Sequence, residues 1–485
     1  MSPSRLSLTD TGLRTEAGSF RDPGNRVFYL DGQVLRGLDR RATEDWHALA
    51  ASDFFPPLLT SGKVCGTEPV DRDPLPEAAR DHWDTVLRHE RIPFVSYPYE
   101  WSFGMLRDAA LLHLEILAAA LPAGFSTKDG SAYNLQWRGA TPVFIDIGSF
   151  EPAREGEPWA GYRQFCQTML YPLMIQAHLG LDFQPWLRSR IDGVEPGQMR
   201  RLFSGTRRFA AGVFTHVRLH DAMQARHAST STGAARDELR DAGFSRDLVQ
   251  ATVRALERLV RRLDGAPPAS HWGRYRTTCS YSDADREHKE RFVEAALTGT
   301  GSRPELVLDL GANDGDYSRL AARHSAYVVA VESDPGMVEQ LYQRLRADGE
   351  RRIMPLLLDL ADPSPGGGWR GAERAPFAAR ADADAVLALA VIHHLAIGRN
   401  VPLDEIVDWL VGFVTKAGPG GRLVAEFVHP EDPMAQRLLA NKPAGLFPDY
   451  RRDEFERLLA RRCEIIAREE LPSGTRTLYV GVPRG

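Results

Sequence analysis

The second half of the chain predicts a parallel, doubly wound α/β sheet, and the first half predicts a separate α+β domain. Three observations in the second half support this fold class. Short apolar runs alternate with helical stretches of about 10–15 residues, as in a parallel sheet with helices on both faces. The first run, 306–308, leads through Asp309 into a glycine turn, and the second, 327–331, ends in Glu332. Turns and carboxylates at strand ends meet at one edge of such a sheet, where ligands bind.

Further strands follow in order along the second half. Each is a short apolar run that ends at a turn or at polar residues. The expected ranges are 352–358, closed by Asp359 and Leu360; 383–391, which includes Ala390; 422–427, which follows a glycine turn; and a closing pair at 462–467 and 475–482.

The turn after the first strand favours one ligand class over another. A dinucleotide site requires G-x-G-x-x-G, so that a pyrophosphate can approach the backbone. Here Gly311 and Gly315 are present, but Asn313 stands where the middle glycine belongs, and Asp314 and Asp316 lie at the start of the helix. These carboxylates would repel a pyrophosphate. They suit a positively charged ligand without phosphate, such as S-adenosylmethionine.

Residues 276–485 therefore resemble the class I S-adenosylmethionine-dependent methyltransferases, which have a Rossmann-like fold. The resemblance implies that the glycine turn holds the methionine and sugar parts of the cofactor. It also implies that Glu332 binds the ribose hydroxyls and that Asp359 binds adenine. The cofactor-binding residues expected on this basis are Asp309, Gly311, Ala312, Asn313, Gly315, Glu332, Asp359, Leu360 and Ala390.

Polar residues that follow the fourth and fifth strands are candidates for catalysis and substrate binding. Methyl transfer to a hydroxyl needs a base, for which histidine is suited. His393 and His394 lie just past the fourth strand, so one of them is a candidate base, although both could instead be core or capping residues. Glu426 and His429 follow at the same rim and are expected to contact substrate rather than a metal. Tyr281 lies in the leader before the first strand and is a third substrate candidate.

The first half predicts smaller elements. The runs 26–30 and 33–38 alternate like a hairpin around Asp31 and Gly32. A short helix is expected at 43–51 with Thr43 as its cap, a strand at 93–97, and a long apolar helix at 103–121. A second hairpin precedes Asp146.

This order resembles the protein-kinase-like and small-molecule phosphotransferase fold. There a catalytic aspartate precedes a metal-binding asparagine by five residues, and a second metal-binding aspartate follows in a D-x-G turn. Asp129, Asn134 and Asp146 match in type and spacing and are expected to converge in one cleft. No lysine equivalent to that of the third strand is present, and Arg36 is the best-placed cation. Two interpretations remain open. The domain is degenerate and binds no metal, or it is active and Asn134 and Asp146 bind magnesium-ATP.

A closer resemblance covers most of the chain. The segments 94–101 (FVSYPYEW), 128–134 (KDGSAYN), 142–146 (PVFID) and 392–397 (IHHLAI) are similar to a bacterial family with both halves in one chain, which includes nodulation-related methyltransferases. The resemblance implies no particular substrate.

Composition narrows the range of partners. The net charge of −5 and the pI near 6.3 do not indicate binding to phosphate backbones, so no nucleic-acid partner is expected. The four cysteines are scattered, without a metal-binding spacing. No long apolar run or targeting segment is recognised, so we expect a cytoplasmic protein without a membrane partner. The oligomeric state is not determined.

These features predict a methyltransferase with a tail at 1–17, a kinase-like domain at 18–225, a linker and helical connector at 226–275, and the catalytic domain at 276–485. The expected reaction is O- or N-methylation of a small molecule, or of its carrier- or nucleotide-bound form, in specialised metabolism or glycan decoration. The first domain would be degenerate and would aid substrate binding. Two alternatives remain: a bifunctional kinase–methyltransferase, and a regulatory protein that binds S-adenosylmethionine without turnover.

Overall fold

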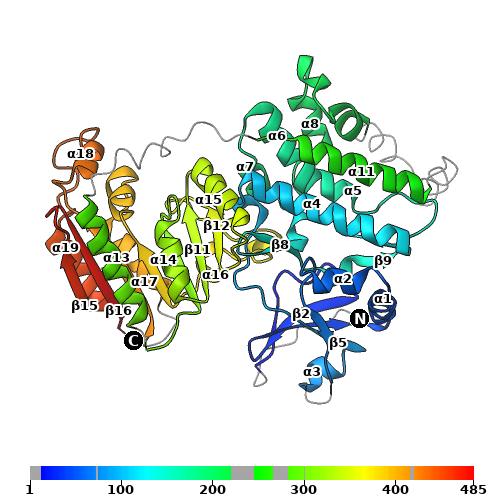
Figure 1. Cartoon of the computed structure of the whole chain (residues 1–485), viewed down its shortest axis with the longest axis horizontal. Coiled ribbons are helices and arrows are strands. Elements are labelled where there is room, and N and C mark those ends of the chain that lie inside the picture. The colour runs from blue at the N-terminus through cyan, green and yellow to red at the C-terminus, as the bar shows by residue number, and fades with distance from the viewer. Residues whose placement is uncertain are drawn as a thin grey trace.

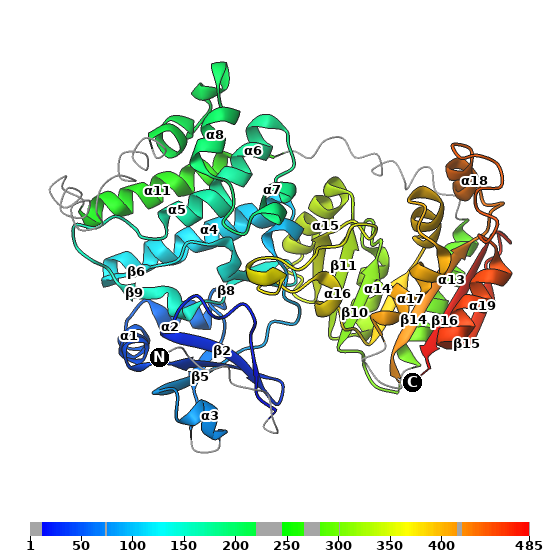
Figure 2. The same cartoon turned by 180° about the vertical axis from the view of Figure 1, so that it is seen from behind.

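The structure is a computed structural model that describes residues 12–72, 75–219, 245–265, 282–299, 301–414 and 420–484. Two bodies lie side by side, the first ending with helix α11 (Arg246–Arg262) and the second beginning with helix α13 (Asp283–Thr298) (Figure 1). The reverse view in Figure 2 shows the same arrangement, in which α15 of the second body packs against α4 of the first, and the edge strand β12 contacts β7.

The second body is built on a seven-stranded sheet with the order β12-β11-β10-β13-β14-β16-β15. The five strands β10 to β14, with β12 at the edge, pair in parallel. Strand β16 pairs antiparallel with β14 and β15. The predicted doubly wound α/β sheet is confirmed. Its strands are β10 (Leu306–Leu310), β11 (Tyr327–Glu332), β12 (Ile353–Leu357), β13 (Ala385–Ala388), β14 (Arg422–Val428), β15 (Cys463–Glu470) and β16 (Arg476–Pro483).

Helices connect these strands and cover the sheet. They carry apolar stripes whose residues are buried against it, as the helical spacing in the sequence predicts. The helices are α13, α14 (Asp316–His324), α15 (Pro335–Ala347), α16 (Phe377–Arg380), α17 (Leu403–Gly412), α18 (Pro433–Leu439) and α19 (Arg452–Arg462), with short turns η8 (Trp369–Gly371) and η9 (His394–Gly398).

The first body combines an antiparallel sheet with a helical part. The sheet order is β1-β2-β3-β5-β4, and β6–β9 and β7–β8 form two small pairs. The strands are β1 (Arg14–Thr15), β2 (Asn25–Leu30), β3 (Gln33–Leu38), β4 (Thr67–Pro69), β5 (Thr85–His89), β6 (Phe125–Thr127), β7 (Leu135–Arg138), β8 (Thr141–Phe144) and β9 (Phe150–Pro152). The helices are α1 (Arg40–Ala50), α2 (Phe55–Thr60), α3 (Glu77–Arg80), α4 (Phe103–Ala120), α5 (Tyr162–Phe165), α6 (Tyr171–Leu179), α7 (Gln184–Ser189), α8 (Pro196–Leu202) and α11, with turns η1 (Pro98–Glu100), η2 (Leu121–Ala123), η3 (Ala132–Asn134), η4 (Ile147–Ser149), η5 (Cys166–Leu170), η6 (Gly205–Phe209) and η7 (Val213–Leu219).

The predicted hairpin is confirmed, because β2 and β3 pair around Asp31 (φ 49°) and Gly32 (φ 76°), both in the left-handed region that a tight hairpin turn requires. Two other expectations in this region are wrong. Helix α1 begins at Arg40 because the Asp39 carboxylate, not Thr43, caps it by accepting a hydrogen bond from the Ala42 amide. The range 93–97 is not a strand, and β5 instead pairs with β3 and β4 in the sheet.

The boundaries of the first body differ from those expected. Part of the segment assigned to a tail forms β1, which pairs with β2. Helix α11, within the expected connector, packs against α4 and buries Val249, Val253, Leu256 and Val260. The connector therefore contributes to the core of the first body. Its small-polar stretch, 228–234, lies outside the described residues.

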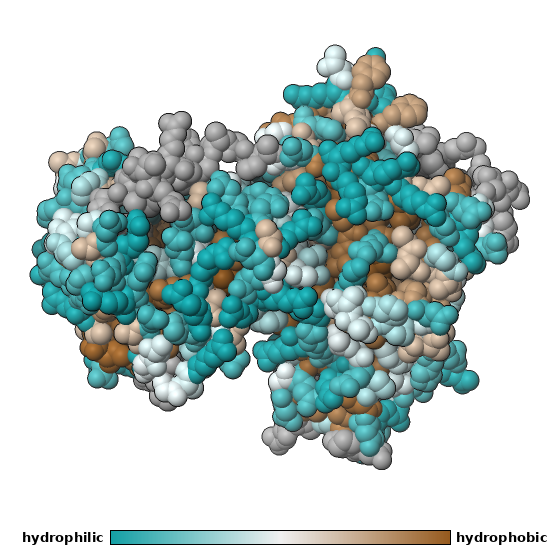
Figure 3. Space-filling view, viewed as in Figure 1, coloured by the Kyte–Doolittle hydropathy of each residue, from teal (hydrophilic) through white to brown (hydrophobic). Residues whose placement is uncertain are grey.

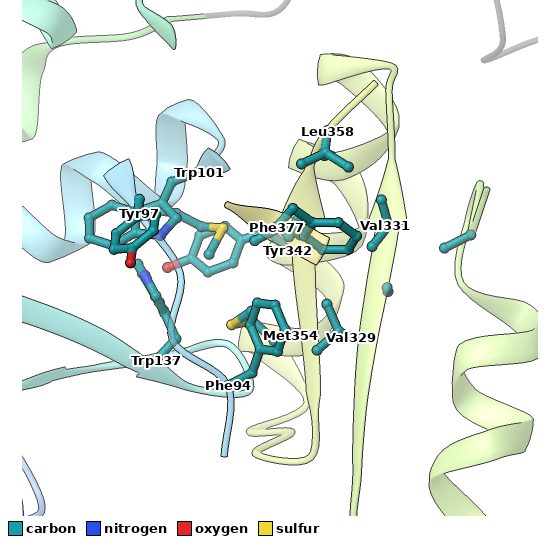
Figure 4. Packing of buried hydrophobic residues seen from close by; sticks show 14 of the residues in the cluster. Phe94, Tyr97, Trp101, Trp137, Val329, Val331, Tyr342, Met354, Leu358 and Phe377 are labelled. Carbon is teal, nitrogen blue, oxygen red and sulfur yellow. The ribbon is translucent and has the colours of Figure 1, made fainter. Parts of the chain in front are cut away.

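Aromatic residues join the two bodies. Phe94, Tyr97, Trp101 and Trp137 lie opposite Tyr342, Met354 and Phe377, which come from helices α15 and α16 and from the edge strand β12 (Figure 4). The ring centroids of Trp137 and Tyr342 are 5.7 Å apart, in an edge-to-face arrangement. The first body thus covers the edge of the large sheet, which would otherwise expose unpaired strand hydrogen-bonding groups.

Hydrophilic residues predominate on the face seen in Figure 3, over both bodies. Among the described residues, no helix combines the length and apolar character needed to cross a membrane.

Candidate functional site

A cavity of about 440 Å³ opens at the carboxyl edge of the parallel strands. Its size lies within the usual range of small-molecule sites. Its walls combine carboxylates with apolar side chains, contributed by the ends of β10, β11, β12 and β13 and by α13. All nine residues expected to bind the cofactor, except Gly315, line it: Asp309, Gly311, Ala312, Asn313, Glu332, Asp359, Leu360 and Ala390.

The turn after β10 adopts backbone angles that explain its sequence. Gly311 and Gly315 have φ of 81° and 84°, and Asn313 has φ of 49°. Glycine enters this left-handed region without penalty, and asparagine is among the few other residues that tolerate it. The replacement of the middle glycine by Asn313 therefore preserves the turn. A Cβ on Gly315 would lie 2.5 Å from the Leu341 side chain, so Gly315 allows α15 to pack behind the turn rather than lining the cavity itself.

Two carboxylates flank this turn. Asp309 is buried and accepts a hydrogen bond of 2.5 Å from the Ser318 hydroxyl. Burial raises the pKa of Asp309 to about 6, while the Ser318 hydrogen bond and nearby Lys289 oppose the rise. Glu332 accepts hydrogen bonds from the amides of Asn313 (3.0 Å) and Asp334 (3.0 Å). These bonds tie the ends of β10 and β11 into one acidic wall.

The expected adenine end of the cavity is formed by Asp359, Leu360 and Ala390. The Asp359 carboxylate accepts a hydrogen bond of 2.9 Å from the Ala361 amide and forms an ion pair with Arg399 across the cavity. Ala390 has φ of 54°, an unfavourable conformation for a residue with a Cβ, as is common at ligand sites.

The structure distinguishes the two histidines. His394 lines the cavity, whereas His393 does not line it and is fully buried. Burial lowers the pKa of His394 to about 4, so its ring is neutral at pH 7. Burial also lowers the pKa of His393 well below the usual value, and neither of its ring nitrogens has a hydrogen-bond partner among the described residues. Of the pair, only His394 can reach a ligand in this cavity.

Glu426 and His429 lie away from the cavity. Glu426 is fully buried and forms ion pairs with Lys289 (2.7 Å) and Arg476 (3.1 Å). His429 pairs with the Thr477 hydroxyl at 2.8 Å. Neither Glu426 nor His429, both expected to contact substrate, lines this cavity. Tyr281 lies outside the described residues.

Sequence reasoning missed several cavity residues. Lys289 on α13 lines the cavity with its ammonium 4.7 Å from the centre of the Tyr317 ring, and burial lowers its pKa although Glu426 opposes the shift. The rarity of lysine in this chain was the available signal for it. Arg399 carries no signal in the sequence, because it reaches Asp359 only after η9 has folded. Arg286 and Glu290, on the same helix as Lys289, also line the cavity.

The three polar residues of the first body do converge. The Asn134 amide donates to the Asp129 backbone carbonyl (3.4 Å), and burial followed by the nearby charge of Asp146 raises the pKa of Asp129. Arg36 on β3 forms an ion pair of 2.8 Å with Asp146 and also donates to Asn25 (2.7 Å). The cation expected from the sequence is therefore present, and it is bound to the carboxylate that an active kinase-like site was expected to use for magnesium.

The sheet order and the cavity define the class of the second body, a Rossmann-like α/β domain with a ligand cavity at the carboxyl edge of its parallel strands. The chain is 33% identical over 469 residues to the nodulation protein NoeA of Rhizobium meliloti (strain 1021), covering 96% of this chain and 95% of that protein. It therefore belongs to the NoeA family. No family model matches the chain.

Solved structures with similarity to this chain include two methyltransferases. Magnesium protoporphyrin IX methyltransferase (ChlM) from Synechocystis PCC 6803 with bound SAH is 18% identical, with a TM-score of 0.31 over 44% of this chain and 94% of that one. The N-methyltransferase NodS from Bradyrhizobium japonicum WM9 with S-adenosyl-L-homocysteine is 14% identical, with a TM-score of 0.31 over 41% and 88%. At these identities and TM-scores, neither structure indicates a function for this chain.

Proposed function

We propose that the chain is an S-adenosylmethionine-dependent methyltransferase acting on a small molecule or on its carrier- or nucleotide-bound form. The observation that carries the proposal is the cavity itself. It places the left-handed turn after β10, Glu332, Asp359 and neutral His394 around one space. The cofactor supplies an electrophilic methyl group on a sulfonium.

The residues present fit this cofactor. Glu332 can accept hydrogen bonds from a ribose diol, and Asp359 can accept one from an amino group of adenine. Leu358 and Leu360 supply an apolar wall for a purine. Asp314 and Asp316 at the cavity favour a positive charge and disfavour phosphate. His394 can accept a proton from an oxygen or nitrogen acceptor, because its ring is neutral at pH 7.

Binding measurements test the cofactor assignment. Asp309→Ala and Glu332→Ala are each expected to weaken S-adenosylmethionine binding by at least ~1.5 kcal/mol, because each removes a charged hydrogen-bond acceptor from the cavity wall. Isothermal titration calorimetry gives the affinity. Asp348→Ala is the matched control, since Asp348 is exposed and pairs with Arg319 outside the cavity. Wild-type affinity for S-adenosylmethionine in both cavity variants would contradict the assignment of the cofactor to this cavity.

For the first body we propose a degenerate kinase-like domain that aids substrate binding. Asp129, Asn134 and Asp146 converge as such a domain requires, but Arg36 and Asn25 fill the space beside Asp146. A Cβ on Gly148 would lie 2.9 Å from the Arg36 guanidinium and 2.8 Å from the Asn25 amide nitrogen. Arginine is also a poor geometric replacement for the phosphate-binding lysine.

Magnesium-ATP is accordingly expected to raise the melting temperature by about 1 °C or less, since a ligand stabilises only in proportion to its binding. A thermal-shift titration of the wild type and of Asp146→Ala measures it. A large shift that disappears in Asp146→Ala would favour the bifunctional kinase–methyltransferase instead.

Turnover separates the proposed enzyme from a regulatory protein. Purified protein with labelled S-adenosylmethionine and extracts of acceptor molecules should form a methylated product. Tight cofactor binding without transfer to any acceptor would favour the regulatory alternative. The name of the NoeA relative suggests acceptors from nodulation-related metabolism as the first to test.

A further inference from the structure

The segment between Asp359 and Arg380 begins at a wall of the cavity and has little regular structure of its own. It contains only the turn η8, the short helix α16 and an isolated pairing between Gly367 and Arg374. Its first residues, Asp359 and Leu360, line the expected adenine end of the cavity. A wall of this kind needs support from neighbouring elements to hold a carboxylate in a defined position.

The support comes from the first body. Arg188 on α7 binds the start of the segment. Its guanidinium donates to both Asp362 carboxylate oxygens, each at 2.9 Å, and to the Asp362 and Pro363 backbone carbonyls at 3.2 and 3.1 Å. The two carbonyl contacts and the paired carboxylate contacts fix the orientation of the backbone three residues after Asp359.

The remainder of the segment is held in the same way. Arg21 forms two hydrogen bonds, of 2.7 and 2.9 Å, with the buried Glu373 carboxylate. The Ala375 amide donates to the Tyr97 hydroxyl at 2.9 Å. Arg380 forms a buried ion pair with Glu100 and donates to the Val95 carbonyl at 2.5 Å. Every one of these partners belongs to the first body. The first body therefore contacts the segment along its whole length.

We propose that the first body positions the adenine end of the cofactor site, and that Arg188 is the positioning residue closest to it. Arg188 acts through the backbone of 362–363 on Asp359 and does not itself line the cavity. This inference rests on the proposed function, since it concerns the same cavity. It assigns to the first body a role in cofactor recognition that requires no ligand of its own.

The test compares two ligands that differ only at the adenine amino group. The probes are S-adenosylhomocysteine and its 6-deamino analogue, in which a hydrogen atom replaces the amino group of the purine. The wild type is expected to prefer the adenine form by about tenfold, the effect of one well-placed hydrogen bond to a charged group. In Arg188→Ala the preference should fall to about twofold or less, because a displaced Asp359 no longer discriminates between the two bases.

Controls separate positioning from general damage. Arg190→Ala removes a neighbouring arginine whose guanidinium is 4.0 Å from Glu195, and it should retain the wild-type preference. Arg188→Lys should restore part of it. Asp362→Ala should reproduce Arg188→Ala, and the double variant should be no worse than either single one. Asp362 is exposed and outside the cavity lining, so it does not contact the ligand directly.

Each outcome is decisive. If the wild type binds neither probe, the proposed function fails first. If the wild type discriminates and Arg188→Ala discriminates equally, the positioning inference is overturned while the proposed function stands. If Arg188→Ala loses affinity for both probes equally, so that the ratio of the two affinities is unchanged, the positioning inference is also overturned. That pattern indicates general destabilisation.

Discussion

His394→Ala is expected to lower the rate of methyl transfer by about 10²–10⁴-fold, the usual effect of losing a general base. Cofactor affinity should change little, because the carboxylates expected to bind the cofactor, Asp309, Glu332 and Asp359, lie at the ends of other strands. Transfer of a labelled methyl group, at saturating cofactor, measures the rate, and calorimetry measures the affinity.

The pH dependence gives an independent check on His394. The neutral ring is the form that accepts a proton, and it predominates above the pKa. Because burial lowers that pKa to about 4, the acid limb of kcat should lie near pH 4. An unperturbed histidine would place it near pH 6.5. An acid limb near pH 6.5 that disappears in His394→Ala would contradict the described burial.

His393→Ala is the matched control. His393 is buried and outside the cavity lining, so its loss should lower the melting temperature but leave most of the turnover. The double variant should resemble His394→Ala in rate. Normal turnover in the double variant would show that neither histidine acts in catalysis and that both have a structural role.

Glu426→Ala should lower the free energy of unfolding by about 3–5 kcal/mol, the usual cost of removing one partner from a buried ion pair. Glu426 is fully buried, and its removal leaves the Lys289 ammonium and the Arg476 guanidinium without this carboxylate. Arg476 would keep its bonds to Asp432, at 2.8 and 3.2 Å, so the loss falls mainly on Lys289. Urea denaturation of the ligand-free protein measures the change.

A surface pair provides the comparison. Glu257, which is partly exposed, pairs with the exposed Arg261 on α11, and Glu257→Ala should cost no more than about 0.5 kcal/mol. Glu426→Gln keeps the size of the side chain and should fall between the two. If Glu426→Ala were as mild as Glu257→Ala, the buried network would contribute nothing to stability.

Local chemistry made several features predictable. Asp31 and Gly32 are suited to a left-handed hairpin turn, and β2 and β3 follow from it. The turn from Asp309 to Gly315 was likewise recognisable, because few residue types adopt its backbone angles. Helix α1 shows the limit: Asp39 and Thr43 are both good capping residues, and only the observed hydrogen bond to Ala42 decides between them.

Residues distant in sequence decided the remainder. His393 and His394 are adjacent and chemically identical, so only the packing of η9 against the sheet distinguishes them. Arg36 meets Asp146 across 110 positions, and Arg188 meets Asp362 across 174. Glu426 could not be assigned before α13 and β16 brought Lys289 and Arg476 to it.

By itself, the sequence determined the alternation of strands and helices in the second half, the glycine turn and the acidic strand ends, since these depend on residues close together in the chain. Only the tertiary structure decided which histidine faces the cavity, that the carboxylate of Asp146 is bound by Arg36, and that the first body contacts the segment that follows Asp359. The physical reason is that burial and ion pairing depend on which distant surfaces pack together, and side-chain spacing along the chain does not specify those contacts.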